Sequence, residues 1–522
     1  MLALRLLSNA FFFKLVEWAT LLSAPLAETL GHAGALSTLA VTSFITHEYW
    51  TFSESSPTER PAARTDRARD QTRQIRVSIH YRLQHPGQTM SNQRYAIVGA
   101  GPMGLMAAVR LLDAGHQVDI YERDDRIGGM SAAFDFDGLS IERYYHFICK
   151  TDDPLFALLE RYGLGHTLKW TDTKMGYFYN GRLFKWGTPF ALLGFPHLGP
   201  ISKFRYALHV MYTKGIKDWT ALDKEEAGAW IRRWIGERAY NVMWKDAFHL
   251  KFFEYKDNLS ASWIGTRIKR IALSRRNLMN ESLGYLEGGS MTLLDRMEKD
   301  IVDRGGGIFL SQGIDEVVSE DGRVTGIRTG DNFTAYDGVV STAPIQYVPA
   351  MVPGLPEDFR AQIRAVENIP VACVILKLKH AVSDNFWMNI SDPGIAIPGV
   401  IEYSNLNPGE HPDQKILYAP FYMPKTHAKW KASNAELIEE VLGYLPRLNP
   451  QFKRDWVLAT HCHRYEFAQT ICPPGFQDML PAMRTPVAGF FMADTAYYYP
   501  EDRSISESLQ AADRLAQEVL EA

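Results

Sequence analysis

The sequence predicts an α/β fold in which a parallel sheet with flanking helices is joined to an inserted α+β part. Two segments support this prediction. Residues 95–129 read as strand, glycine-rich turn, helix and second strand, and residues 489–519 read as a strand followed by a helix. A third observation is size. The chain of 522 residues, 46% of them hydrophobic and 22% charged, exceeds one ordinary domain and can bury a large core.

The first strand and turn have the spacing of a dinucleotide-binding site. Residues 95–98 are apolar and are followed by Gly99, Gly101 and Gly104 in the order G-x-G-x-x-G. The first glycine allows a tight turn, the second lets a pyrophosphate approach the backbone, and the third lets the next helix pack closely on the strand. The amino-terminal end of that helix then holds the phosphates. This pattern predicts a Rossmann-like domain.

An acidic residue follows the second strand, at the position where a ribose is bound. The helix after the glycines ends at Ala114-Gly115, and residues 117–121 read as the second strand. Glu122 then follows Gly104 at close to the roughly 20-residue offset at which a carboxylate accepts hydrogen bonds from the adenosine ribose hydroxyls. A negative charge here disfavours a 2′-phosphate, so the segment predicts a site for FAD or NAD and not for NADP.

Two further motifs favour FAD. Arg126-Ile-Gly-Gly129 resembles the R-x-G-G extension of the amine oxidase, protoporphyrinogen oxidase and phytoene desaturase group of flavoproteins, in which the Arg and the glycine backbone lie near the FAD pyrophosphate. Gly489-Phe-Phe-Met-Ala-Asp494 resembles the carboxy-terminal strand of that group, whose Asp contacts the ribityl-phosphate region. The start of the next helix, residues 504–519, would point at the flavin, where its positive end favours the anionic edge of reduced flavin.

A third segment returns to the same domain. Residues 306–344 read as short strands separated by turns, and such a stretch in this flavoprotein group carries a backbone contact to the adenine at the position matched by Ile314. The motifs together predict the cofactor-binding residues Gly99, Gly101, Pro102, Met103, Gly104, Glu122, Arg123, Arg126, Gly128, Gly129, Met130, Ile314, Asp494, Ser504 and Ile505.

Several short motifs follow one another in a characteristic order along the chain. They include Glu142-Arg-Tyr-Tyr-His-Phe, the segment 244–251, Leu283-Gly-Tyr-Leu-Glu-Gly-Gly289 and Tyr499-Pro-Glu-Asp-Arg503. Over roughly residues 93–518 this order resembles a bacterial family of HemY-like, protoporphyrinogen-oxidase-related FAD oxidoreductases. The resemblance implies the family's fold and its FAD, whereas a substrate does not follow from it. One departure is Tyr145-His146, where family members tend to have a His pair.

Composition excludes several other classes of function. The net charge of −4 gives no electrostatic basis for binding nucleic acid. The four cysteines form no C-x-x-C pair and have no metal-ligand spacing, which is typical of reduced cysteines in the cytosol. His461 and His463 share one face of a strand but have no third or fourth ligand nearby in the sequence, so we expect no metal site there.

The amino-terminal region has a different character. Residues 1–52 are mostly apolar and include a stretch, 29–47, that is free of Asp, Glu, Lys and Arg and just long enough to span a bilayer. Residues 53–90 are polar and rich in Arg, Pro and Ser, as expected of a disordered linker. A membrane-associated segment followed by a linker would place the flavin domain in the cytoplasm, at the inner face of the membrane. The alternative is that translation begins at Met90.

The remaining chain is expected to bind the substrate. Residues 203–214 have the spacing of an amphipathic surface helix that lets an apolar substrate enter from a membrane, although core packing explains the same spacing. The expected division of the chain assigns residues 91–150, 287–350 and 460–522 to the FAD-binding domain, and residues 151–286 and 351–459 to the substrate-binding domain.

The chemistry follows from the flavin. A flavoenzyme of this kind transfers hydride from a C–H or N–H bond to flavin N5, so the protein positions the substrate, excludes water and supplies a base. His146, Tyr145 and Lys251 are the candidates for that base, and a desolvated Lys titrates low enough to act as one. The sequence therefore predicts an FAD-dependent oxidoreductase, of the dehydrogenase, oxidase or desaturase type, that acts on an apolar or amphipathic, lipid-like small molecule.

Two other functions remain open at this point. One is a flavin-dependent mutase acting on a sugar nucleotide, resembling UDP-galactopyranose mutase, in which reduced FAD acts as a nucleophile. The other is a non-catalytic flavoprotein tethered to a membrane. Net redox turnover would distinguish the predicted oxidoreductase from both of these alternatives. The sequence makes no prediction of the electron acceptor or of the oligomeric state.

Overall fold

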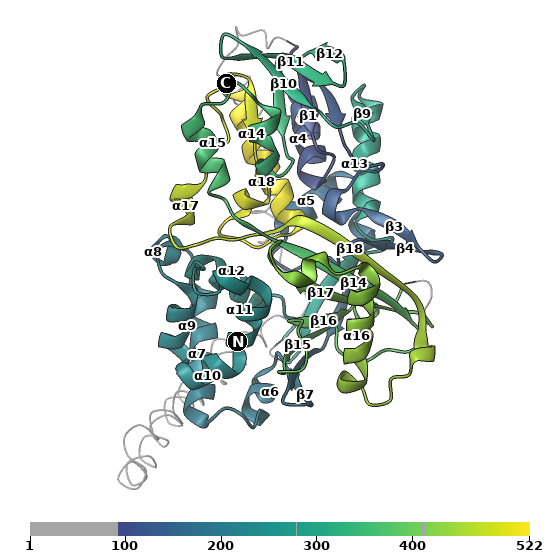
Figure 1. The fold of residues 1–522 in the computed structure, drawn as a ribbon, viewed down its shortest axis with the longest axis vertical. Helices are drawn as coiled ribbons and strands as arrows, with labels where there is room; N and C mark the ends of the chain where they lie inside the picture. The colour runs from purple at the N-terminus through teal and green to yellow at the C-terminus, as the bar shows by residue number, and fades with distance from the viewer. Residues whose placement is uncertain (1–91, 278, 410–412) are drawn as a thin grey trace, which may run out of the picture. The chain divides into compact units, whose positions relative to one another are not determined.

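The glycine-rich turn directly follows the central strand of a five-stranded sheet. The computed structural model describes residues 92–277, 279–409 and 413–522, and all of these residues belong to one unit. The predicted membrane-associated segment, 1–52, and linker, 53–90, lie outside the described residues. In Figure 1 the sheet lies beside the helices α4 and α13.

All neighbouring strands of this sheet run parallel, in the order β19-β13-β1-β2-β9. The central strand β1 is paired on both sides and is buried over residues 95–98, which explains its continuous apolar sequence. Distant parts of the chain therefore complete the sheet. The strands are β1 (Arg94–Val98), β2 (Gln117–Tyr121), β9 (Gly307–Phe309), β13 (Gly338–Ser341) and β19 (Phe490–Met492).

Three helices pack together beside the sheet. Helix α4 (Pro102–Asp113) follows β1 and contacts both α13 (Met291–Asp303) and α18 (Ile505–Leu520). Its apolar residues, among them Leu105 and Val109, are buried, and it ends before Ala114-Gly115 as the sequence predicts. The α/β fold class is confirmed. The structure has the parallel sheet with helices on it, and segments from both ends of the described chain build it.

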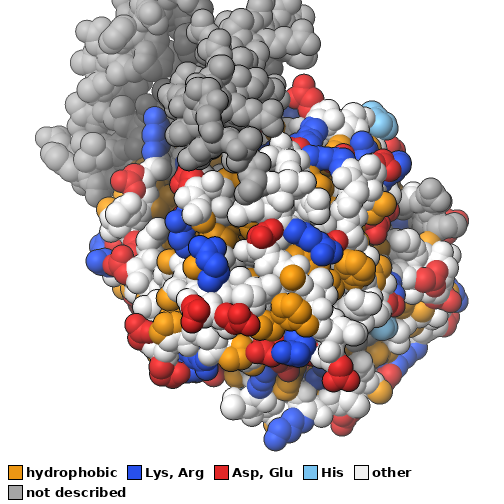
Figure 2. All heavy atoms as spheres, turned by 90° about the horizontal axis from the view of Figure 1, so that it is seen from above, with side chains coloured by type: hydrophobic (Ala, Val, Ile, Leu, Met, Phe, Trp, Pro, Cys, Tyr) orange, Lys and Arg blue, Asp and Glu red, His pale blue; other side chains and the backbone are white. Residues whose placement is uncertain are grey.

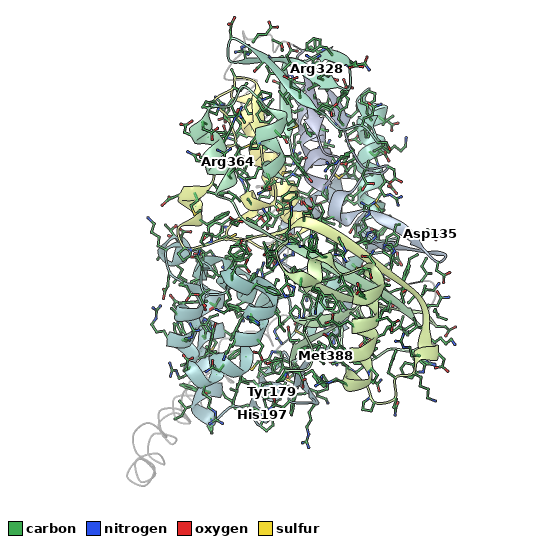
Figure 3. The ribbon with its side chains drawn as sticks, viewed as in Figure 1. Asp135, Tyr179, His197, Arg328, Arg364 and Met388 are labelled. Carbon is green, nitrogen blue, oxygen red and sulfur yellow. The ribbon has the colours of Figure 1, made fainter. Side chains whose placement is uncertain are left out.

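A small antiparallel sheet adjoins the parallel one, because its strand β11 contacts β13. Its strand order is β10-β11-β12. Arg328 of β11, which is labelled in Figure 3, marks the position of this small sheet. All three strands lie within residues 306–344, which the sequence predicted as short strands separated by turns. The strands are β10 (Glu316–Glu320), β11 (Arg323–Thr329) and β12 (Asn332–Ala335).

A seven-stranded sheet forms the second part. Its order is β18-β14-β17-β16-β15-β6-β7, and its pairs are antiparallel except β15 with β6. Strand β18 crosses residue 460, where the sequence predicted the return to the FAD-binding domain. Tyr179 and Met388 in Figure 3 mark the β6 and β15 region. The strands are β6 (Met175–Tyr179), β7 (Arg182–Trp186), β14 (Asn368–Leu378), β15 (Trp387–Ser391), β16 (Gly399–Glu402), β17 (Lys415–Tyr422) and β18 (Val457–Thr470).

Helices α11 and α16 pack on this second sheet. Helix α16 begins with a capping box, in which the Ser433 and Glu436 side chains bond to each other's backbone N–H groups. Two further antiparallel pairs are the hairpin of β3 (Ala133–Phe136) with β4 (Leu139–Glu142) and the long-range pair of β5 (Leu168–Thr173) with β8 (Glu281–Leu286). The helices are α5 (Asp153–Arg161), α6 (Pro189–Gly194), α7 (Pro200–Gly215), α8 (Thr220–Asp223), α9 (Ala227–Ile235), α10 (Glu237–Met243), α11 (Lys245–Phe252), α12 (Ala261–Leu273), α14 (Val348–Met351), α15 (Glu357–Arg364), α16 (Asn434–Leu448) and α17 (Phe476–Met479).

The surface carries mixed charge. On the face seen in Figure 2, Lys and Arg side chains are interspersed with Asp and Glu, in keeping with the small net charge. Among the helices that the structure describes, none combines the length and the apolar sequence needed to cross a membrane.

Candidate active site

One cavity, with a volume of about 780 Å³, extends from the glycine-rich turn to the seven-stranded sheet. Gly99 and Gly101 line its first part, and Trp387 of β15 and Tyr422 of β17 line its far part. The beginnings of α4 and α18 both border it. The cavity therefore connects the predicted dinucleotide site with a wall of aromatic side chains, although the two come from different sheets.

The glycine turn has the geometry that its spacing predicts. Gly99 adopts a φ of +98°, which a residue with a side chain rarely adopts, and a Cβ on Gly104 would overlap the carbonyl oxygen of Gly99. Gly101 is different, because a Cβ there would meet no atom within 4 Å and would project beside the cavity. As Gly101 also begins α4 without a side-chain cap, the helix N-terminus is open to a negatively charged group.

Glu122 supports this turn from the end of β2. One carboxylate oxygen accepts a 2.8 Å hydrogen bond from the backbone N–H of Ala100, and the other accepts one of 2.8 Å from Asp124. The neighbouring Arg123 guanidinium lies over the Tyr347 ring, 4.8 Å from its centroid. Of these five residues, all but Ala100 line the cavity. The carboxylate is thus fixed beside the glycines, where a ribose would need an acceptor.

Three predicted cofactor residues are not among the residues that line the cavity. Gly104 packs α4 onto the turn, and Gly128 packs against Ala132. The Arg126 guanidinium bonds to the Asp125 carboxylate at 2.7 and 3.0 Å and to the carbonyl oxygen of Ala133 at 3.0 Å. The predicted residues that do line it are Gly99, Gly101, Pro102, Met103, Glu122, Arg123, Gly129, Met130, Ile314, Asp494, Ser504 and Ile505.

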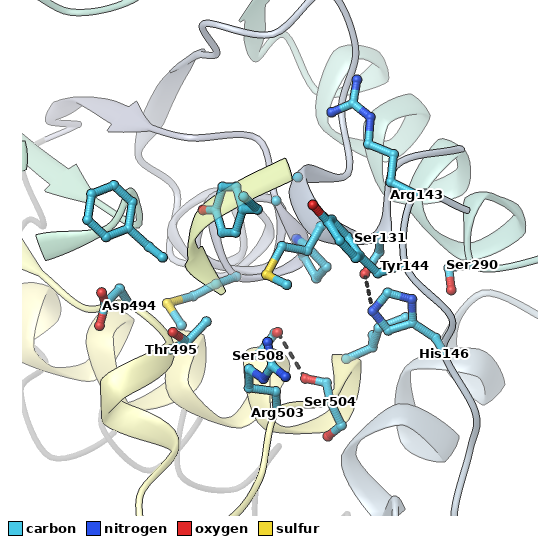
Figure 4. A pocket seen from close by; sticks show the side chains of 18 of the residues that line it. Ser131, Arg143, Tyr144, His146, Ser290, Asp494, Thr495, Arg503, Ser504 and Ser508 are labelled. Carbon is cyan, nitrogen blue, oxygen red and sulfur yellow. Dashed lines mark hydrogen bonds between the residues drawn. The ribbon is translucent and has the colours of Figure 1, made fainter. Parts of the chain in front are cut away.

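The carboxy-terminal segment borders the same cavity. The carboxylate oxygens of Asp494 accept hydrogen bonds from the backbone N–H groups of Ala496, at 2.8 Å, and Ile345, at 3.0 Å. Burial nevertheless raises the pKa of Asp494 to about 6. The Ser504 hydroxyl accepts a 3.0 Å hydrogen bond from the Glu507 N–H and so caps α18. Figure 4 shows Asp494 on one side of the pocket and Ser504 at the start of this helix.

His146 is held by groups that sequence reasoning did not identify. Its Nδ1 lies 2.6 Å from a carboxylate oxygen of Glu142, and its Nε2 lies 3.3 Å from the Ser131 hydroxyl, as Figure 4 shows for the latter. The second oxygen of Glu142 accepts a 2.7 Å hydrogen bond from the Ser290 N–H. Glu142 and His146 pair outside any helix, so helical spacing did not predict their contact. In the sequence, only the motif at residues 142–147 drew attention to Glu142.

Tyr145 points into an aromatic wall. Its ring lies edge-on to Trp387, with 5.4 Å between the ring centroids, and to Tyr418, at 5.8 Å. Burial raises the pKa of the Tyr145 phenol well above its ordinary value, so the group stays protonated at neutral pH. Phe147 packs on the same indole at 6.4 Å. This wall suits an apolar molecule.

Lys251 of α11 lies near charged residues that are distant in sequence. Burial, together with the positive charges of Arg267 and Arg503, lowers the pKa of Lys251 well below its ordinary value, and Asp502 opposes this shift. Asp502 forms a 2.6 Å ion pair with Arg267. Lys251, Asp502 and Arg503 all line the cavity. Sequence reasoning singled out Lys251 but had no means of placing the pair at 502–503 beside it.

The residues fit an FAD. The glycine turn, the open helix N-terminus, Glu122 and the long cavity match a dinucleotide that carries a flat ring system toward the second sheet.

His461 and His463 share a face of β18, with ring centroids 4.2 Å apart, as the sequence predicts. Within the residues described, no group of His, Cys, Asp and Glu is arranged to hold a metal ion.

Comparison with known proteins supports this interpretation. Residues 104–520 match the model of the family described as flavin containing amine oxidoreductase. The 15-cis-phytoene desaturase of Synechococcus elongatus is 24% identical over 442 residues, covering 76% of this chain and 90% of the relative. The zeta-carotene desaturase of Arabidopsis thaliana is 27% identical over 472 residues, covering 77% and 80%.

Solved structures share the fold at lower identity. A protoporphyrinogen oxidase-like protein from Exiguobacterium sp. 255-15 has a TM-score of 0.66 at 18% identity, covering 83% of this chain and 100% of that one. Putrescine oxidase has a TM-score of 0.62 at 17% identity, covering 82% and 99%. The predictions of FAD, of an oxidoreductase and of the amine oxidase and desaturase superfamily are therefore confirmed, and this chain belongs to the flavin-containing amine oxidoreductase family.

Proposed function

We propose that this FAD-dependent oxidoreductase removes hydride from an apolar or amphipathic organic molecule bound in the aromatic part of the cavity. The observation that carries the proposal is the continuity of the cavity from Gly101 to Trp387 and Tyr422. FAD supplies the hydride acceptor when bound. The protein has to hold the reacting bond beside the flavin, exclude water from it and accept a proton.

The proposed cofactor site consists of the predicted residues that border the cavity. Gly101 would admit the pyrophosphate, Glu122 would accept hydrogen bonds from the adenosine ribose, and Asp494 would face the ribityl-phosphate region. Their support is the open space at Gly101 and the fixed orientation of both carboxylates. Arg126 would reach the pyrophosphate only by leaving its bonds to Asp125 and Ala133.

His146 is our proposed proton acceptor. Glu142 fixes its ring through Nδ1, which leaves Nε2 on the cavity side near the small Ser131 hydroxyl. Tyr145 fits the role less well, because its raised pKa keeps the phenol protonated. Lys251, whose pKa burial lowers, is also a candidate, but it lies beside Asp502 and Arg503, so its protonation depends on that charged cluster.

The two other functions have less support. Reduced UDP-galactopyranose mutase shares the fold, with a TM-score of 0.64 over 82% of this chain and 96% of that one, but at 15% identity this likeness concerns the fold alone. Membership in an oxidoreductase family argues against a flavoprotein without catalysis.

We further propose that the protein works in the cytoplasm, at a membrane surface. Helices α6 and α7 expose several large hydrophobic side chains, including Ile201 (75% exposed), Phe190 (67%) and Leu193 (53%). Such a patch is expected where a protein dips into the boundary of a bilayer, and Lys203 beside it would favour anionic headgroups. Leu208 and Met211 of α7 are exposed as well, which supports the surface-helix interpretation of residues 203–214 over core packing.

Anaerobic reduction tests the proposed function. The full chain, loaded with FAD, is mixed without oxygen with isoprenoid, porphyrinogen and amine compounds, and the flavin absorbance is followed. Bleaching by an apolar or amphipathic compound, followed by recovery with an acceptor such as a quinone, is the expected result. Dithionite serves as the control that the bound flavin can be reduced. If dithionite bleaches the flavin but, of the compounds tested, only small polar ones bleach it, the proposed substrate class is wrong.

A further inference from the structure

We propose that Arg503 and Lys251 form a subsite for an anionic group, a carboxylate or a phosphate, on the otherwise apolar substrate. This inference rests on the proposed function, since it concerns the polar end of the molecule bound in the same cavity.

The carboxylate of Asp502, which lies close enough to Arg503 and Lys251 to influence both charges, is already paired. Asp502 forms a 2.6 Å ion pair with Arg267, whose same nitrogen also bonds to Gln469 at 3.0 Å. The pKa of Asp502 agrees with this pairing. Burial raises the pKa, but Arg267 and Lys251 outweigh burial and lower it to about 2. Asp502 therefore stays negative and is paired with Arg267, and neither Arg503 nor Lys251 has an ion pair of its own within the described residues.

The Arg503 and Lys251 side chains border the cavity. Arg503 is the residue before the cap of α18, and its buried Nε–H has no hydrogen-bond partner in the described part of the chain. Lys251 places its ammonium over the Tyr422 ring, 5.3 Å from the centroid, and forms no ion pair with any residue described. Five strands of the seven-stranded sheet lie between the two residues in the sequence, and the fold brings both residues to one cavity.

An uncompensated positive charge in a buried position is strongly unfavourable, and proteins normally pair such a charge. An anion between Arg503 and Lys251 would supply the missing partner, and the planar guanidinium suits a carboxylate or phosphate. The Tyr145 phenol lines the same cavity and stays protonated, so it adds a hydrogen-bond donor. The aromatic side chains beyond it would hold the apolar remainder.

The sign of this charge also selects against other ligands. A substrate amine would meet Arg503 and Lys251 as like charges, and a pure hydrocarbon would leave both without a partner. The desaturases related to this chain are named for carotenes, so the subsite would distinguish this enzyme from them. Because burial and the neighbouring Arg267 and Arg503 lower the pKa of Lys251 while Asp502 opposes them, an added anion would raise it. Anion binding would then take up a proton.

Ligands of one chain length and different headgroups test the proposal. The full chain, loaded with FAD, is titrated by calorimetry with decanoate, decyl phosphate, decan-1-ol and decylamine at pH 7.0 in two buffers of different ionisation enthalpy. We expect decanoate or decyl phosphate to bind at least about 10-fold more tightly than decan-1-ol, because a hydrogen bond to a charged group is roughly twice as strong as a neutral one. The preferred one of the two anions identifies the headgroup.

Variants separate the subsite from other roles of these residues. Arg503→Met and Lys251→Met should each reduce the ratio of anion to alcohol affinity by about 10-fold, whereas Arg503→Lys should retain part of it. Lys251→Met should also abolish the proton uptake seen between the two buffers. Lys299→Met, which removes an exposed lysine of α13 paired with Asp303, is the matched control and should change neither.

Three outcomes would overturn the proposal, and they differ in meaning. Equal binding of decanoate and decan-1-ol would exclude the anionic subsite while leaving an apolar substrate in place. No binding of any of the four ligands would contradict the proposed function as well. If Arg503→Met shifts the flavin absorbance or its midpoint potential and leaves the affinity ratio unchanged, Arg503 acts on the flavin and not on the substrate.

Discussion

The Nδ1 atom of His146 lies 2.6 Å from a carboxylate oxygen of Glu142, and the other oxygen of that carboxylate is held by the Ser290 N–H at 2.7 Å. The imidazole is thus oriented by a buried acid that is itself fixed by backbone. A carboxylate that holds one ring nitrogen determines how the other nitrogen is presented, which is the arrangement that a histidine base requires.

This relationship predicts the effect of removing either partner. His146→Ala should lower kcat by about 100-fold or more, since a general base contributes roughly 10²–10⁴-fold. Glu142→Gln should lower it by a smaller factor, because the amide keeps the size but loses the charge. Steady-state rates on FAD-loaded protein measure both. Tyr145→Phe is the comparison, and a loss as large as that of His146→Ala would assign the base to the tyrosine.

The glycines of the turn should fail in different ways. In Gly101→Val the side chain would project beside the cavity, so the apoprotein should keep its Tm but retain little FAD. In Gly104→Ala the new Cβ would overlap the Gly99 carbonyl oxygen, so the Tm of the apoprotein itself should fall. FAD absorbance per protein and thermal unfolding of the apoprotein distinguish the two. Full FAD content in Gly101→Val would mean that the pyrophosphate lies elsewhere.

Lys251 should make stability depend on pH. Burial lowers its pKa in the folded state, with Arg267 and Arg503 adding to the effect and Asp502 opposing it, so the unfolded chain binds this proton more tightly. The resulting cost is full below the folded pKa and diminishes as pH rises toward the unfolded value of about 10.4. Lys251→Met should therefore raise the Tm of the apoprotein more at pH 7 than at pH 10. An equal change at both pH values would show that only packing had altered.

The exposed patch on α6 and α7 should bind lipid. Ile201→Glu combined with Phe190→Glu should reduce cosedimentation with vesicles that contain anionic lipid, because two side chains that are 75% and 67% exposed would no longer enter the bilayer boundary. Phe333→Glu is a matched control, since Phe333 of β12 is 51% exposed in the small antiparallel sheet. Unchanged cosedimentation of the double variant would contradict the proposed membrane surface.

Local sequence determined the cofactor end of the protein. The tight turn at Gly99, the close packing at Gly104, the ends of α4 and the strand β2 all arise from interactions within one continuous segment, so spacing alone predicted them. The same holds for Asp494 and for the helix that begins after Ser504, because a strand, a cap and an apolar helix follow one another directly.

The tertiary structure alone decided which side chains share the cavity. Arg503 and Lys251 line one cavity, and Asp502 pairs with Arg267, only because α11, α12 and the start of α18 converge there. Glu142 lies four residues before His146, but an irregular backbone, not a helical repeat, joins them. Periodicity reports which face of an element is buried, whereas charge pairing between elements depends on how they pack, and that information is not local in the sequence.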